Sequence, residues 1–78
     1  MKKITIVGAG RVGESEAQIL AKEELCRELV MIDIQEGVPQ GVALDVQESG
    51  SLLRFDTRVR GDTDPAAMAD SDMVIVTA

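Results

Sequence analysis

The residues Gly8-Ala9-Gly10-Arg11-Val12-Gly13 decide the fold of this chain. They follow a short apolar run at residues 4–7 and precede a segment with helical periodicity. Asp33 lies about 20 residues after Gly13, at the end of a second apolar run. A lone Gly-x-Gly-x-x-Gly pattern is weak evidence. The same pattern between a strand and a helix, with an acid at the tip of the next strand, predicts a dinucleotide-binding site.

The hydrophobic pattern of the whole chain alternates between strands and helices. Strands are predicted at residues 4–7, 29–34, 57–61 and 72–77, with helices at about 10–24 and 39–48 and a helical turn from 65 to 68 or 69. This order predicts an α/β fold, a Rossmann-type parallel sheet comprising the first half plus one strand, in the order 3-2-1-4 with flanking helices. We expect the third strand to be the more exposed one and the fourth to be buried.

Ligands of such sheets bind at the carboxyl ends of the strands, where the strand order reverses. Here that crevice lies between strands one and four, with the glycine loop on one lip and Thr77-Ala78 on the other. Gly8 permits a tight turn, Gly10 lets backbone approach a pyrophosphate, and Gly13 lets helix and strand pack closely. The alternative is a glycine-rich turn that binds nothing.

Asp33 is expected to accept hydrogen bonds from the hydroxyls of an adenosine ribose. Its charge would repel a 2′-phosphate, which favours NAD over NADP. The alternative is an exposed acid at a strand end. Glu14 and Glu16 fall in the first turns of the predicted helix, where they favour the helix dipole but oppose a bound pyrophosphate. Arg11 either reaches a phosphate to offset them or is a solvated loop residue.

Composition excludes several classes of function. The chain has 78 residues, a net charge of −6 and a single aromatic residue, Phe55, which argues against nucleic-acid and anionic-membrane partners. Cys26 is the only cysteine, so no disulfide framework can form, and a cytoplasmic setting with a buried, structural thiol is expected. The chain has no histidine, and no metal site is predicted. Acids such as Asp62 and Asp64 are interpreted as turn and cap residues.

Four segments carry a resemblance to a known family: residues 3–10, 28–34, 36–45 and 71–78. The third is the specific one, since Gly-Val-Pro-Gln-Gly at a helix start followed by Ala-Leu-Asp is not general to Rossmann folds. The chain resembles the lactate/malate dehydrogenase superfamily, and within it the bacterial, lactate-dehydrogenase-like malate dehydrogenases. The likeness covers essentially all of the chain but only about the first quarter of such an enzyme. The family often has Asn at position 11, small residues or Thr at 14 and 16, and Lys at 42.

The resemblance implies that the chain is the N-terminal, NAD-binding part of an enzyme that moves hydride between malate and NAD. Its catalytic residues would come later, so none is assigned here and the isolated chain is expected to be inactive. The glycine loop would take the pyrophosphate, Asp33 the ribose, and the residues after the fourth strand would form a wall near the cofactor's sugars. The candidate cofactor-binding residues are therefore Gly8, Ala9, Gly10, Arg11, Val12, Gly13, Asp33, Thr77 and Ala78.

Two other functions stay open at this level. Gly-Ala-Gly-Arg-Val-Gly also resembles the nucleotide-sensing regulatory domains of potassium transport, although these do not usually carry the Gly-Val-Pro-Gln-Gly segment. A minimal Rossmann fragment that assembles without a tight ligand is the third possibility. Because the chain stops on its fourth strand, we expect a truncated domain. We also expect a homo-oligomer, formed through the 39–48 helix or the exposed edge at residues 74–76.

Overall fold

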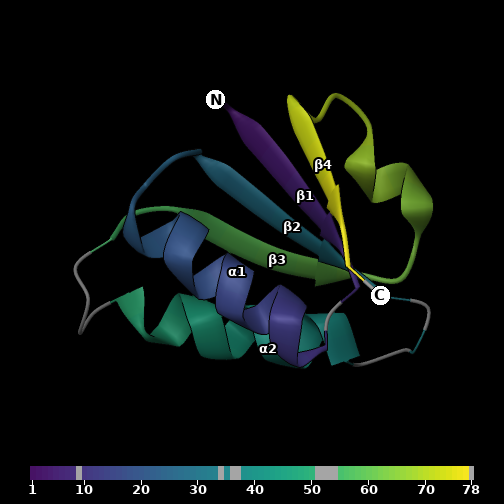
Figure 1. Ribbon diagram of the computed structural model, residues 1–78, viewed down its shortest axis with the longest axis horizontal. Coiled ribbons are helices and arrows are strands. Elements are labelled where there is room, and N and C mark those ends of the chain that lie inside the picture. Colours follow the sequence, from purple (N-terminus) through teal and green to yellow (C-terminus); the bar gives the residue numbers. More distant parts are fainter. Residues whose placement is uncertain (9, 34, 36–37, 51–54, 78) are drawn as a thin grey trace.

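The fold was analysed in a computed structural model, which describes residues 1–8, 10–33, 35, 38–50 and 55–77. The elements alternate as the sequence predicts (Figure 1). In chain order they are β1 (Lys3–Val7), α1 (Arg11–Lys22), β2 (Glu28–Ile32), α2 (Val38–Glu48), β3 (Arg58–Asp62), the 3₁₀ helix η1 (Pro65–Met68) and β4 (Met73–Val76). Among the described residues, no helix has the length and apolar character needed to cross a membrane.

The strands form a four-stranded sheet in the order β3-β2-β1-β4, and every neighbouring pair is parallel. The predicted order 3-2-1-4 is therefore confirmed. The crossovers from β1 to β2 and from β2 to β3 run in the same direction across the sheet. Helices α1 and α2 consequently cover the same face (Figure 1), while η1 packs against β2 from the other face.

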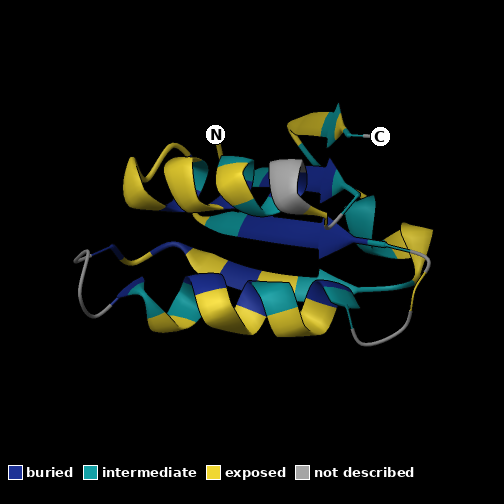
Figure 2. Ribbon diagram, turned by 60° about the horizontal axis from the view of Figure 1, so that its bottom comes forward, coloured by how far each residue is buried: buried dark blue, intermediate teal, exposed yellow. Residues whose placement is uncertain are grey.

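The core lies between the sheet and the two long helices (Figure 2). Alternate residues of β1 and β2 point into it, because successive side chains of a strand face opposite sides. On α1 the predicted inward face is confirmed, since Gly13, Ala17 and Ala21 are buried and Leu20 packs beside them. The buried cluster consists of Ile4, Ile6, Ala17, Ala21, Cys26, Leu29, Met31, Ala43, Val46, Phe55 and Val59.

Strand β4 differs from its prediction. Its composition indicated a buried strand, but Val76 is 75% exposed, and Met73 and Val74 are 41% and 44% exposed. Within the described residues β4 pairs only with β1, and Ile75 is the residue of β4 that packs against the core. The apolar sequence of a strand indicates the environment for which the strand is suited. The exposure of β4 therefore reflects a lack of packing partners among the described residues, and its side chains are not polar. Strand β3 is more exposed than β1 and β2, as predicted, since only Val59 is buried there, but it is less exposed than β4.

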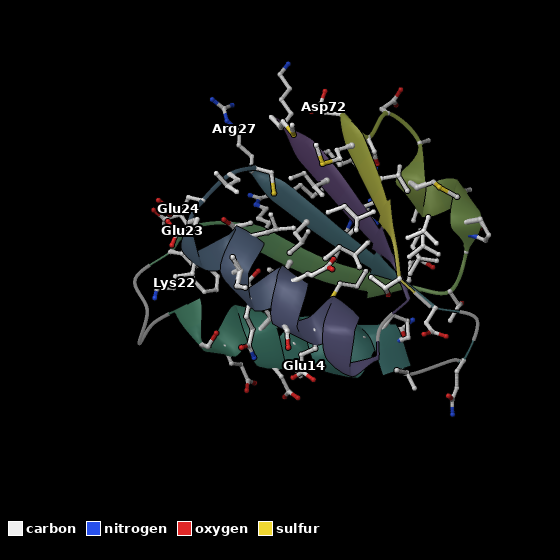
Figure 3. The ribbon with its side chains drawn as sticks, in the orientation of Figure 1. Glu14, Lys22, Glu23, Glu24, Arg27 and Asp72 are labelled. Carbon is white, nitrogen blue, oxygen red and sulfur yellow. The ribbon has the colours of Figure 1, made fainter. Side chains whose placement is uncertain are left out.

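Asp72, which immediately precedes β4, links the amino-terminal ends of β1 and β4. Its Oδ2 accepts the backbone N–H groups of Lys2 and Lys3 at 2.7 and 2.9 Å, and its own N–H donates to the Lys3 carbonyl at 2.8 Å. The N–H groups of Lys3 and Lys2 lower the pKa of the Asp72 carboxyl, because they stabilise its charged form. Figure 3 shows Asp72 at this edge, where the starts of β1 and β4 meet.

We predict that Asp72→Asn destabilises the chain at neutral pH and that the difference disappears in acid. A carboxyl whose pKa is lower in the folded chain contributes stability above its unfolded pKa of about 3.9 and loses it as the pH falls through the folded value. Urea unfolding at pH 7 and near pH 2 measures this. Asp45→Asn, an exposed acid on α2, is the control. An Asp72→Asn deficit that is the same at both pH values would contradict the assignment.

Candidate functional site

The predicted site residues meet at the carboxyl ends of the strands. The Gly8 N–H donates to the Ile32 carbonyl at 2.7 Å, which ties the turn after β1 to the end of β2. The Thr77 N–H donates to the Val7 carbonyl at 2.8 Å, which ties the end of β4 to the same turn. Gly8, Asp33 and Thr77 therefore lie at one edge of the sheet, as the topology predicts (Figure 1).

Two glycines of the loop are required by the fold itself. Gly8 has a φ of +106°, a backbone conformation that side chains disfavour, and a Cβ there would collide with Thr77. A Cβ on Gly13 would collide with the Gly8 carbonyl oxygen. The first turn of α1 can thus pack directly on the end of β1, which confirms the tight-turn and close-packing roles predicted for these two residues.

Gly10 is different, because nothing in the fold requires a glycine there. Its φ is −76°, it is exposed, and a Cβ would meet no atom within 4 Å. It caps the N-terminus of α1 without a side-chain hydrogen bond. The N-terminal N–H groups of a helix lack intrahelical acceptors and carry a partial positive charge. The open space over Gly10 therefore gives an anion a route to this helix end.

Asp33 directly follows β2 and is held in place by its neighbours. Its N–H donates to the Asp62 carbonyl at 3.3 Å, and its Oδ1 accepts the Gln35 N–H at 3.2 Å. The residue is half-buried at the same edge as the glycine loop. Its position one residue after Ile32, the partner of Gly8, places it next to the loop, as expected for a residue that recognises the sugar beside a bound diphosphate.

Two glutamates give the start of α1 a negative charge. Glu14 lies in the first turn and is half-buried (Figure 3). Glu16 has a buried Oε2 without a hydrogen-bond partner among the described residues, and it borders a small apolar hollow with Ile19, Leu20 and Ile75. Both charges oppose an anion at the helix end, although solvent screening reduces the effect.

Some candidate residues lie outside the described residues, and others have side chains that are not described. Ala9 and Ala78 are outside the described residues, and the side chains of Arg11 and Val12, the first residues of α1, are not described. Whether Arg11 offsets the glutamates is therefore left to experiment. Among the described residues, no group of three His, Cys, Asp or Glu side chains is placed to hold a metal ion.

The predicted turn and cap roles of Asp62 and Asp64 are confirmed. Asp62 Oδ1 accepts the Asp64 N–H at 2.9 Å, and Asp64 Oδ1 accepts the Ala66 N–H at 2.9 Å to cap η1. Cys26 is buried at the opposite end of the sheet, and burial raises the pKa of its thiol, as expected of an unreactive structural cysteine.

Sequence reasoning missed one feature of the site. The Thr77 hydroxyl lies 3.2 Å from the Val7 carbonyl oxygen and 3.1 Å from that of Gly8, so it reaches into the glycine turn rather than only bordering it. No local signal could have found this contact, because the partners are about 70 residues apart and meet only through the pairing of β1 with β4.

Comparison with known proteins identifies the family of the chain. A family model described as lactate/malate dehydrogenase, NAD binding domain, matches residues 2–78. The chain belongs to this family. The match favours the enzyme family over the potassium-transport regulators that share the glycine pattern, and it confirms the resemblance carried by the Gly-Val-Pro-Gln-Gly segment.

Individual relatives agree. The chain is similar to a malate dehydrogenase of Nitrosococcus oceani, with 64% identity over all of this chain and 25% of the relative. It is also similar to the structure of a malate dehydrogenase from Salinibacter ruber, with 47% identity, a TM-score of 0.93 and coverage of 97% of this chain and 25% of that one. A Cryptosporidium parvum lactate dehydrogenase complexed with lactic acid and NAD has 40% identity and a TM-score of 0.93, over 99% of this chain and 24% of that one. The chain thus spans about a quarter of the length of these relatives.

We predict opposite tolerances at two glycines of the loop. Gly13→Ala should lower the free energy of unfolding by about 3 kcal/mol, since a rigid backbone carbonyl occupies the space of the added Cβ. Gly10→Ala should cost about 1 kcal/mol or less, the preference for glycine over alanine at a helix N-cap. Chemical denaturation measures both. Equal losses would show that Gly10 serves the fold after all.

Proposed function

We propose that residues 8–13 hold the diphosphate of NAD against the N-terminus of α1. The observation that supports this most directly is Gly10, an exposed glycine with an ordinary φ and open space above it. A side chain there would not disturb the fold but would obstruct a ligand that must touch backbone. In this proposal Gly8 and Gly13 shape the turn. The backbones of Ala9, Arg11 and Val12 complete the turn, in agreement with the resemblance, which assigns residues 8–13 to the pyrophosphate.

Asp33 is proposed to accept hydrogen bonds from the adenosine ribose hydroxyls. Its place at the end of β2, beside the turn that holds the diphosphate, supports this role. A carboxylate there favours NAD and disfavours a 2′-phosphate. Thr77 and Ala78 are proposed to form the wall of the site on the β4 side, near the sugars of the cofactor.

In the complete protein the proposed reaction is hydride transfer between malate and NAD. The malate dehydrogenases similar to this chain support this assignment. The chain forms the N-terminal part of the dinucleotide-binding domain, and the catalytic residues are proposed to lie in the remaining three quarters. The 78 residues contain no histidine, the commonest general acid or base. The isolated chain is therefore proposed to bind NAD without turning over malate. A cytoplasmic location is part of the same proposal.

Affinity for NAD should be modest. Backbone N–H groups and the helix dipole attract the diphosphate. Glu14 opposes it, as does the buried oxygen of Glu16, which has no hydrogen-bond partner among the described residues. The net charge of −6 adds a weak repulsion, which salt screens. An NMR titration, which detects weak binding, is therefore the appropriate measurement.

We predict that NAD shifts the amide resonances of residues 8–13 and Asp33 selectively. Asp33→Asn should weaken NAD binding about tenfold or more, because a hydrogen bond to a charged group contributes about 1.5–3 kcal/mol. Asp45→Asn, which removes the same charge from the exposed side of α2, should bind like the parent chain. Shifts spread evenly over the chain, or no response at all, would favour the assembling fragment over the cofactor site.

We further propose that the chain forms homo-oligomers. Two exposed apolar surfaces support this: the β4 edge, where Val76 is 75% exposed, and the outer side of α2, where Leu44 is 57% exposed. Gly41 adds open space on α2, which would let another helix approach closely. An apolar strand edge recruits other chains through its unpaired backbone groups.

Sedimentation should therefore show a dimer or a larger assembly. Val76→Lys places a charge on the β4 edge and should shift the distribution towards monomer if that edge carries the contact. Leu44→Lys does the same for α2, so the pair distinguishes the two surfaces. A parent chain that sediments only as a monomer would contradict both.

A further inference from the structure

The hydroxyl of Thr77 links β4 to the turn that starts the glycine loop. Its Oγ1 lies 3.1 Å from the Gly8 carbonyl oxygen and 3.2 Å from the Val7 carbonyl oxygen, and its proton is shared between them. The Thr77 N–H also donates to Val7 at 2.8 Å. Thr77, the residue directly after β4, thus contacts the carbonyl oxygens of both residues at the turn.

Three contacts hold the backbone of Gly8 in place. Its N–H is bonded to Ile32 of β2, its carbonyl oxygen receives the Thr77 hydroxyl, and Gly13 of α1 packs against that same carbonyl. Its φ of +106° is open to glycine but disfavoured for residues with a side chain. The orientation of the Gly8 peptide therefore sets where α1 begins, and with it the direction of the N–H groups at the helix start.

We infer that Thr77 is a positioning residue whose hydroxyl holds the Gly8 turn in the geometry that binds a diphosphate. This inference rests on the proposed NAD site and deepens it. The resemblance implies that Thr77 borders the sugars, whereas in the structure its hydroxyl lies within hydrogen-bond distance of two backbone carbonyl oxygens. Thr77 acts through Gly8 and the start of α1, and its loss should affect the diphosphate more than the adenosine.

The chain contains a matched control for this hydroxyl. Thr57 is buried, and its Oγ1 also donates to two backbone carbonyls, those of Ala21 and Cys26 at 3.1 and 3.3 Å. It lies before β3 at the opposite end of the sheet. Replacing either threonine by valine removes a hydroxyl that lies near two backbone carbonyl oxygens, but the two variants do so at opposite ends of the sheet.

The experiment measures NAD and adenosine binding by amide shifts in the parent chain, Thr77→Val, Thr77→Ser and Thr57→Val. Thr77→Val should bind NAD about five- to tenfold more weakly, the loss of about one hydrogen bond, with adenosine binding unchanged. Thr77→Ser keeps the hydroxyl and its hydrogen bond. Its dissociation constant for NAD should therefore stay within about twofold of the parent value. Thr57→Val should bind both ligands like the parent chain. NAD binding by Thr77→Val at parental strength, or an equal loss in both valine variants, would overturn the inference.

Amide hydrogen exchange without ligand separates this inference from the proposed function. Thr77→Val should speed exchange at Glu14, whose N–H bonds to the Gly10 carbonyl at 2.8 Å in the first turn of α1, and Thr57→Val should not. If the parent chain fails to bind NAD, the proposed function is wrong, and the exchange result alone decides whether Thr77 holds the turn. Unchanged exchange at Glu14 in Thr77→Val would reject the positioning role.

Discussion

The close contact between Gly13 and the Gly8 carbonyl is the constraint on which the rest of this structure depends. Only three residues separate the end of β1 from the start of α1. The N-terminus of α1 can therefore face the crevice only if the two backbones nearly touch. That approach leaves no room for a Cβ at Gly13, and Thr77 occupies the space of a Cβ at Gly8. It brings the positive end of α1 to the carboxyl edge of the sheet, where the ends of β2 and β4 also meet. The packing requirement and the binding requirement are therefore met by the same turn.

Most of the fold follows from sequence because its determinants are local or periodic. Alternating strand and helix patterns fix the element order, and right-handed crossovers then leave few sheet orders to consider. The candidate site is predictable because Gly8 and Gly13 are required by the fold, whereas Gly10 and Asp33 have the spacing expected for the proposed ligand. The capping by Asp64 was predictable for the same reason, since an acid before a proline satisfies an N–H group two residues later.

The features that escaped prediction are tertiary. Thr77 contacts Gly8 only because β4 pairs beside β1, and no nearby residue signals that contact. The composition of β4 was misleading, because its Val-Ile-Val sequence is that of a central strand, and only the topology indicated the exposed edge at residues 74–76. Composition reports the environment for which a segment is suited. Composition does not indicate whether residues of the same chain segment provide that environment.

The charges at the start of α1 show how fold and affinity can be separated. Glu14 suits the helix dipole and Glu16 is accommodated beside Leu20 and Ile75, so the helix tolerates both. Neither residue touches the glycine contact that sets the turn. In the proposed site, however, a diphosphate would approach the same helix end and meet both carboxylates as like charges. Substitutions of this kind leave the backbone geometry of the family intact while weakening the electrostatic attraction that the geometry serves, so the fold alone does not set the strength of cofactor binding.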